Sequence, residues 1–158
     1  MLKKCCDLLE QHQLKIAFIE SASSGFLCSQ FSICKNSGAD ILLGGLVSYD
    51  PSIKVDVLGI NPAFIELYTA ESAEVTEAMT IHGKNLFNHA DIVVACTGLL
   101  KPGGSVTKTK PEGTFFTSIL YLNKTHNFHY FIDGTPLYRL SALTHYVATE
   151  IIKLIDGV

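Results

Sequence analysis

Apolar positions in the first two thirds of the chain fall into two patterns. Residues 15–19 and 91–96 form nearly continuous apolar runs, which are typical of strands buried on both faces of a sheet. Residues 2–13, 23–35 and 71–87 place apolar side chains at helical spacing instead. Strands that alternate with helices along a chain indicate an α/β fold.

Shorter elements lie between these runs, and a different pattern closes the chain. Residues 46–49 predict a further strand. Residues 114–122 and 127–132 predict a hairpin of two strands, and residues 137–155 predict a long final helix. An antiparallel hairpin beside parallel strands makes the sheet mixed. We therefore expect residues 1–158 to form one domain, a three-layer α/β/α sandwich with a mixed β-sheet.

Three of the predicted strands lead into polar loops. These loops begin after Glu20, after Tyr49 and after Thr97. In open α/β sheets, ligands bind beyond the carboxyl ends of the strands, so the three loops are candidates for one shared site. That site would bring Ser21 and Lys54 together with a glycine-rich segment.

The first loop, residues 20–25, leads from a strand into a helix. Small residues let a ligand approach the backbone, and the unpaired amides of a first helical turn stabilise an anion or a developing oxyanion. Ser21 stands where a nucleophile would be presented. The alternative is a helix cap, in which Ser21, Ser23 or Ser24 accepts a hydrogen bond from the helix backbone.

The second loop supplies a candidate base for Ser21. A serine hydroxyl is a weak nucleophile until a neighbouring base accepts its proton, and a lysine accepts a proton only when its amine is neutral. Lys54 would be this base, and Tyr49, five residues earlier, would orient the lysine or relay the proton. The alternative is a solvated surface lysine near a half-buried tyrosine.

The third loop, residues 97–112, has sixteen residues, a length that is typical of functional or disordered segments. Gly103 and Gly104, with hydroxyls and lysines nearby, suit a bound phosphate. The sequence contains neither a Walker A pattern nor a GxGxxG pattern. The alternative is a mobile surface loop.

Composition and charge exclude several function classes. The net charge of -3, without a run of Lys or Arg, argues against nucleic-acid binding, and no apolar segment reaches the ~20 residues that span a membrane. The six histidines are scattered, so no metal is expected. The strand-end loops also hold no histidine for a Ser-His-Asp triad, although sequence order alone does not exclude one.

Cysteine usage and the balance of apolar residues indicate where the protein works and how it assembles. Five cysteines without CxxC spacing, and an N-terminus without a signal-peptide core, favour a soluble protein of the cytoplasm. The chain is 47% hydrophobic and only 17% charged. We therefore expect a covered subunit interface, in a homodimer or a higher homo-oligomer.

Five blocks of the sequence, in order and with similar spacing, resemble the C-terminal domain of the competence/damage-inducible CinA proteins, a family that includes nicotinamide-nucleotide amidases. The blocks are residues 20–25 (ESASSG), 44–49 (GGLVSY) followed by Lys54, 70–75 (AESAEV, where the family has AVSEEV), 97–104 (TGLLKPGG) and 110–114 (KPEGT). The resemblance extends from about residue 2 to residue 154.

The resemblance implies hydrolysis of the carboxamide of nicotinamide mononucleotide (NMN) to the acid, with release of ammonia and without a cofactor. It makes Ser21 the nucleophile, Lys54 its base and Tyr49 an assisting residue. The expected partner is a small-molecule nucleotide substrate. The candidate substrate-binding residues are Glu20, Ser23, Ser24, Gly25, Gly45, Thr97, Gly98, Gly103, Gly104, Lys110 and Arg139.

The sequence departs from the family pattern within these blocks. Ala22 replaces a cysteine, Lys101 replaces a glycine, and Ser24 replaces a glycine at a position that suits φ > 0. The family's Gly-Asp-Arg before the last helix is Gly-Thr-Pro at residues 134–136, which leaves Arg139 as the only arginine. The alternative function is therefore a catalytically weakened or inactive nucleotide-binding or interaction protein on the same fold.

Overall fold

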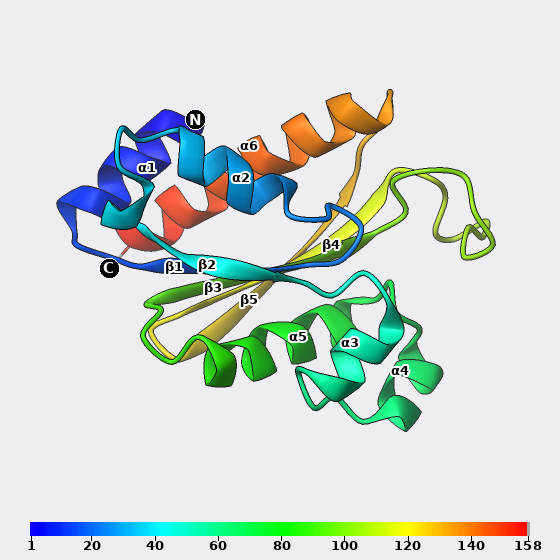
Figure 1. The fold of residues 1–158 in the computed structure, drawn as a ribbon. Coiled ribbons are helices and arrows are strands. Elements are labelled where there is room, and N and C mark those ends of the chain that lie inside the picture. The colour runs from blue at the N-terminus through cyan, green and yellow to red at the C-terminus, as the bar shows by residue number, and fades with distance from the viewer. Residues whose placement is uncertain (158) are drawn as a thin grey trace.

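A five-stranded sheet lies at the centre of the computed structural model, which describes residues 1–157 (Figure 1). Its strands are β1 (Ile16–Glu20), β2 (Leu42–Val47), β3 (Ile92–Gly98), β4 (Thr114–Tyr121) and β5 (Lys124–Phe131). The order across the sheet is β2-β1-β3-β4-β5. β1 is parallel to β2 and to β3, whereas β4 is antiparallel to β3 and to β5. The sheet is therefore mixed, as predicted.

Helices cover both faces of this sheet (Figure 1). One layer contains α1 (Leu2–Gln11), α2 (Phe26–Ile33) and α6 (Pro136–Asp156), and the other contains α3 (Pro51–Asp56), α4 (Pro62–Tyr68) and α5 (Ala73–Leu86). A short 3-10 helix, Gly38–Asp40, precedes β2. The three-layer α/β/α sandwich expected from the sequence is confirmed. No helix within residues 1–157 is long and apolar enough to cross a membrane.

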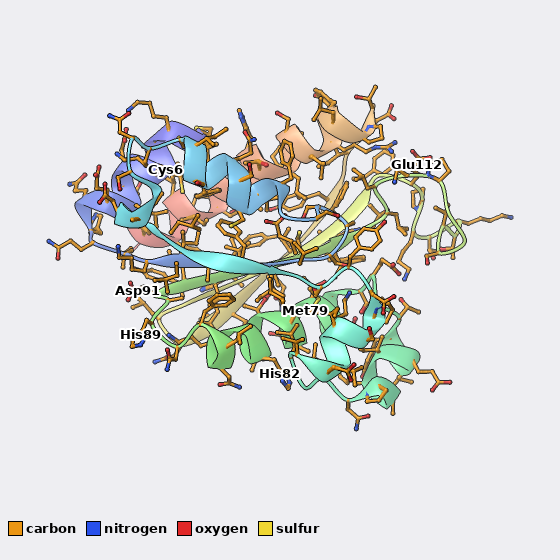
Figure 2. All side chains as sticks on the ribbon, viewed as in Figure 1. Cys6, Met79, His82, His89, Asp91 and Glu112 are labelled. Atoms are coloured by element: carbon orange, nitrogen blue, oxygen red, sulfur yellow. The ribbon has the colours of Figure 1, made fainter. Side chains whose placement is uncertain are left out.

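Two apolar clusters form the core, one on each face of the sheet. Every residue of β1 and β3 is buried, because both strands lie inside the sheet and are covered on both sides. Along β1, Phe18 belongs to one cluster and the next residue, Ile19, belongs to the other. Figure 2 shows Cys6 within the α1–α2–α6 layer and Met79 between α5 and the sheet.

The boundaries of α2, β2 and β3 differ from those expected from the sequence. α2 begins at Phe26 rather than at residue 23, because Ser24 and Gly25 have φ of +52° and +89° and cannot be helical. β2 begins at Leu42, well before residue 46. β3 extends to Gly98, so the long loop comprises residues 99–113. Its base is closed by two hydrogen bonds, from the Gly113 amide to the Leu99 carbonyl and from the Leu99 amide to the Thr114 carbonyl.

Candidate active site

The carboxyl ends of β1, β2 and β3 lie side by side at one edge of the sheet, because these strands are adjacent and parallel. Ser21 follows β1, and the long loop follows β3. After β2 the chain passes through Ser48 and Tyr49 into α3, which carries Lys54. Figure 1 shows α3 and the base of the long loop at this same end of the sheet. The structure thus brings the three predicted loops together.

Lys54 is buried, with only 1% of its surface exposed. Its Nζ donates to the carbonyl oxygen of Ser48 at 2.5 Å and to Ser21 Oγ at 3.1 Å. An ammonium carries three protons, and within residues 1–157 Nζ has no third acceptor. A neutral amine fits these partners better, since it can donate to Ser48 while its lone pair accepts the hydroxyl proton of Ser21.

The electrostatic surroundings of Lys54 shift its protonation equilibrium toward the neutral amine. Burial lowers the pKa of Lys54, because desolvation disfavours the ammonium. The negative charges of Glu71 and Asp50 oppose this change, Glu71 more strongly, but the lowering prevails. A lysine in this state can accept a proton at a pH where an exposed lysine cannot.

Glu20 has a structural role that the sequence did not reveal. It is 1% exposed, and its carboxylate accepts hydrogen bonds from the amides of Gly25 (3.0 Å), Leu27 (3.1 Å) and Cys28 (2.7 Å). These are the first-turn amides that we expected to be free for an anion. That expectation, and the assignment of Glu20 as a substrate-binding residue, need correction, because the Glu20 carboxylate itself fills the anion position of α2.

Ser23, Ser24 and Gly25 shape the turn that carries Ser21. Ser23 is buried, and its Oγ lies 2.8 Å from the thiol of Cys96. The Ser24 amide donates to the Ser21 carbonyl at 3.0 Å. The N-cap residue of α2 is Gly25, and no serine side chain caps this helix. The helix-cap alternative for Ser21 is therefore wrong.

Cys96, near the end of β3, has the second side chain at this site that could act as a nucleophile. It is 1% exposed, and burial raises the pKa of its thiol to about 12. A thiol in this state stays protonated at neutral pH and is a poor nucleophile. The partly exposed Ser21, which contacts the amine of Lys54, is thus the better candidate.

A cavity of about 180 Å³ adjoins the Ser21 turn. Its walls are Ala22, Tyr49, Glu71 and residues 98–105. The predicted residues Gly98, Gly103 and Gly104 are therefore part of the cavity wall. Tyr49 is 58% exposed, and within the described range its hydroxyl has no hydrogen bond to Ser21 or Lys54, so its assisting role stays a prediction.

The two charged residues of the cavity wall, Glu71 and Lys101, were not among the predicted site residues. Glu71 reaches the cavity from the connection between α4 and α5, which does not follow any strand. The rule that ligands bind at strand ends therefore gave no signal for it. Lys101 did carry a signal, because it replaces a glycine of the family pattern.

Thr97 and Lys110 lie next to the cavity wall and support it, whereas Gly45 lies elsewhere. Thr97 is fully buried, and its Oγ1 lies 2.8 Å from Oγ1 of Thr76 on α5. Gly45 lines a separate cavity of about 330 Å³ between α2 and β2, which does not include Ser21 or Lys54. Lys110 Nζ donates to Thr69 Oγ1 at 2.7 Å and to the carbonyl of Glu71 at 2.9 Å, so it fastens the long loop to the α4–α5 connection.

Arg139, a candidate substrate-binding residue, is turned into the protein. It is 5% exposed, and its guanidinium donates to the carbonyls of Ile132 (3.0 Å) and Leu100 (2.8 Å) and pairs with Glu112. Leu100 and Glu112 lie at the two ends of the long loop, and Figure 2 shows Glu112 at its base. The assignment therefore needs correction: Arg139 braces the loop from beneath. Within residues 1–157, no three His, Cys, Asp or Glu side chains gather as a metal site.

The chain is an α/β protein in which a buried lysine contacts a serine at the carboxyl ends of the parallel strands of a mixed sheet. The chain belongs to the CinA C-terminal domain family, whose model matches residues 1–154.

Several curated proteins called CinA-like protein are similar to this chain. Those of Mycobacterium avium and Mycolicibacterium gilvum are 38% and 37% identical over 105 and 128 residues, which cover 66% and 81% of this chain and 24% and 27% of theirs. The chain thus spans about a quarter of the length of these curated relatives.

Solved structures of CinA superfamily proteins have the same fold. A CinA superfamily protein from Klebsiella pneumoniae matches with a TM-score of 0.90 at 17% identity, covering 99% of this chain and 97% of that one. A competence or damage-inducible protein from Enterobacter asburiae gives 0.88 at 22% identity, covering 98% and 96%.

Proposed function

We propose that this protein is an amidohydrolase that converts NMN to nicotinate mononucleotide and ammonia, with Ser21 as the nucleophile and Lys54 as its base. The observation that carries the proposal is the 3.1 Å contact between the buried Nζ of Lys54 and Oγ of Ser21. The family resemblance supplies the substrate. Five free cysteines suit a reducing compartment, so we assign the reaction to the cytoplasm.

The first half of the proposed reaction forms an acyl-enzyme. Neutral Lys54 accepts the hydroxyl proton as Ser21 Oγ bonds to the carboxamide carbon. The Ser48 carbonyl holds the resulting ammonium in place. The amide of Ala22 has no acceptor within residues 1–157, and it suits the developing oxyanion because it directly follows the nucleophile. The carbon–nitrogen bond then breaks, and Lys54 returns the proton to the nitrogen, which leaves as ammonia.

The second half releases the acid. Water attacks the acyl carbon while Lys54 accepts one of its protons. The ester bond to Ser21 then breaks, and Lys54 returns the proton to Oγ. Water is the only co-reactant, and the serine and lysine finish in their starting states.

The long loop is the proposed phosphate site. A Cβ added at Gly103 or Gly104 would meet nothing within 4 Å, so the backbone there is open to a ligand. The amide of Gly104 has no acceptor within the described chain, and Lys101 and Lys108 are exposed nearby on the same loop. Free amides and ammonium groups together suit a phosphate monoester.

One observation favours a second candidate function, nucleotide binding with weak or no turnover. The only arginine, Arg139, is engaged by Ile132, Leu100 and Glu112. Phosphate recognition then depends on loop amides and exposed lysines alone, which position a ligand less rigidly than a bidentate arginine. Poor positioning lowers the rate of the chemical step even where the nucleophile and base are intact.

Ammonia release from NMN tests the proposal directly. We expect the native protein and Ser29→Ala, a control at an exposed serine of α2, to release ammonia, and Ser21→Ala to release none above background. Equal release from the native and Ser21→Ala proteins would reject the proposed nucleophile. Calorimetric binding of NMN without any ammonia release would favour the second function instead.

A further inference from the structure

Glu71 places a carboxylate on the wall of the site cavity. It belongs to the connection between α4 and α5, and it shares the cavity with Tyr49 and Ala22, the neighbour of the nucleophile. Its carboxylate has no ion-pair partner within residues 1–157. The family pattern has an apolar valine at this position, so the charge is a property of this chain.

Opposite charges lie on two different walls of the cavity. Glu71 lies on the wall formed by the α4–α5 connection, and Lys101 lies on the wall formed by the long loop. Lys110 is near Glu71, but its ammonium bonds to the Glu71 carbonyl and to Thr69, not to the carboxylate. Lys54 is held by Ser21 and Ser48. The cavity wall therefore carries one carboxylate without an ion-pair partner within residues 1–157, that of Glu71, and one exposed ammonium, that of Lys101.

From this arrangement we infer that Glu71 recognises a positive charge on the ring that carries the reacting carboxamide, and so makes the site selective for a cationic pyridinium over a neutral ring. The inference rests on the proposed function and adds the electrostatic basis of its substrate selection. A pyridinium nucleotide has a cationic ring and an anionic phosphate, and Glu71 and Lys101 on the cavity wall carry the complementary charges.

Glu71 also affects the pKa of Lys54. Among the charges around Lys54, Glu71 is the one that opposes the lowering of the lysine pKa most strongly, so its field reaches the reacting groups. A cationic ring would neutralise this field when it binds. The carboxylate would then hinder the neutral amine least when the correct substrate is present.

Binding of two nucleotides that differ in ring charge tests the inference. NMN has a cationic ring, and reduced NMN has a neutral dihydropyridine ring with the same carboxamide, ribose and phosphate. Calorimetry on the Ser21→Ala protein would measure both dissociation constants without turnover, with and without Glu71→Gln. We expect Glu71→Gln to weaken NMN binding about three- to five-fold, as for a partly exposed ion pair, and to leave reduced NMN unchanged.

A matched control and an assay of turnover separate the alternatives. Glu74→Gln removes the same charge from an exposed position of α5, outside the cavity, and should leave both dissociation constants unchanged. Equal weakening of the two nucleotides by Glu71→Gln, no weakening of either, or no binding of NMN at all would overturn the inference. Selective binding in a native protein that releases no ammonia would overturn the proposed hydrolysis alone.

Discussion

Replacing Lys54 by Met tests whether the pKa of Lys54 is lowered in the folded protein. The test measures the free energy of unfolding and does not depend on catalysis. Methionine keeps much of the length and apolar character of the lysine stem and removes the ionisable group. The 1% exposure of Lys54 means that the new side chain stays within the same packing. The substitution removes the donor to the Ser48 carbonyl, and leaving this acceptor unpaired costs about 1–3 kcal/mol at every pH.

The pH-dependent part of the effect has a definite sign. Burial lowers the pKa of Lys54 in the folded protein, so the unfolded chain binds more protons than the folded chain between that lowered pKa and the ordinary value of 10.5. In this window the native protein gains stability as the pH rises, by up to about 1.4 kcal/mol per pH unit. The Lys54→Met protein lacks this gain.

Urea denaturation at several pH values between about 7 and 10 would measure the effect. We expect the free energy of unfolding of the native protein to increase with pH relative to that of Lys54→Met. The control is Lys4→Met, at an exposed lysine, whose difference from the native protein should not change with pH. A pH-independent difference for Lys54→Met as well would refute the lowered pKa. In an assay of ammonia release, Lys54→Met should also lose at least about a hundred-fold in kcat.

Three further predictions concern the supports of the site and the assembly. Glu20→Gln should lower the free energy of unfolding by about 1–3 kcal/mol, because the single side-chain oxygen of glutamine cannot accept all three backbone hydrogen bonds. Glu66→Gln, at an exposed position, should change it little, and chemical denaturation would compare the two variants. Arg139→Met should speed hydrogen exchange in residues 99–113 and leave β3 unchanged, and equal exchange in the loop would contradict the bracing role. Light scattering should give a mass above 17.2 kDa, and a purely monomeric species at micromolar concentration would exclude the expected homo-oligomer.

The fold could be predicted because its signals are local. β1 and β3 are buried on both faces, and this produces the continuous apolar runs in the sequence. β2 was placed too late, since Gly44 and Gly45 interrupt its apolar pattern. The proximity of Ser21 and Lys54 was predicted from the parallel strands and from the family blocks. In the structure, Lys54 Nζ lies 3.1 Å from Ser21 Oγ.

The roles of Glu20, Arg139 and Glu71 could not be predicted in the same way. The direction of each side chain depends on where distant segments lie. Arg139 contacts Leu100 across 39 positions of sequence, and no pattern within either segment indicates this. Glu20 was assigned to the substrate with the other residues of the family motif beside Ser21, yet its carboxylate points toward α2. Proximity in sequence to a functional residue is thus a weak guide to contact with a substrate.

Ser24 is a position where the sequence did indicate a backbone constraint, because it replaces a family glycine, and the structure gives it a φ of +52°. A non-glycine residue in this region costs roughly 1–2 kcal/mol, and glycine costs about 0.5–1 kcal/mol in the entropy of the unfolded chain. Ser24→Gly should therefore leave the free energy of unfolding within about 1 kcal/mol of the native value or raise it. Ser24→Val should lower it by about 1–3 kcal/mol, because a β-branched residue fits this φ poorly. The control is Ser29→Val at an exposed helical position, and equal stability of the two valine variants in urea would contradict the strain.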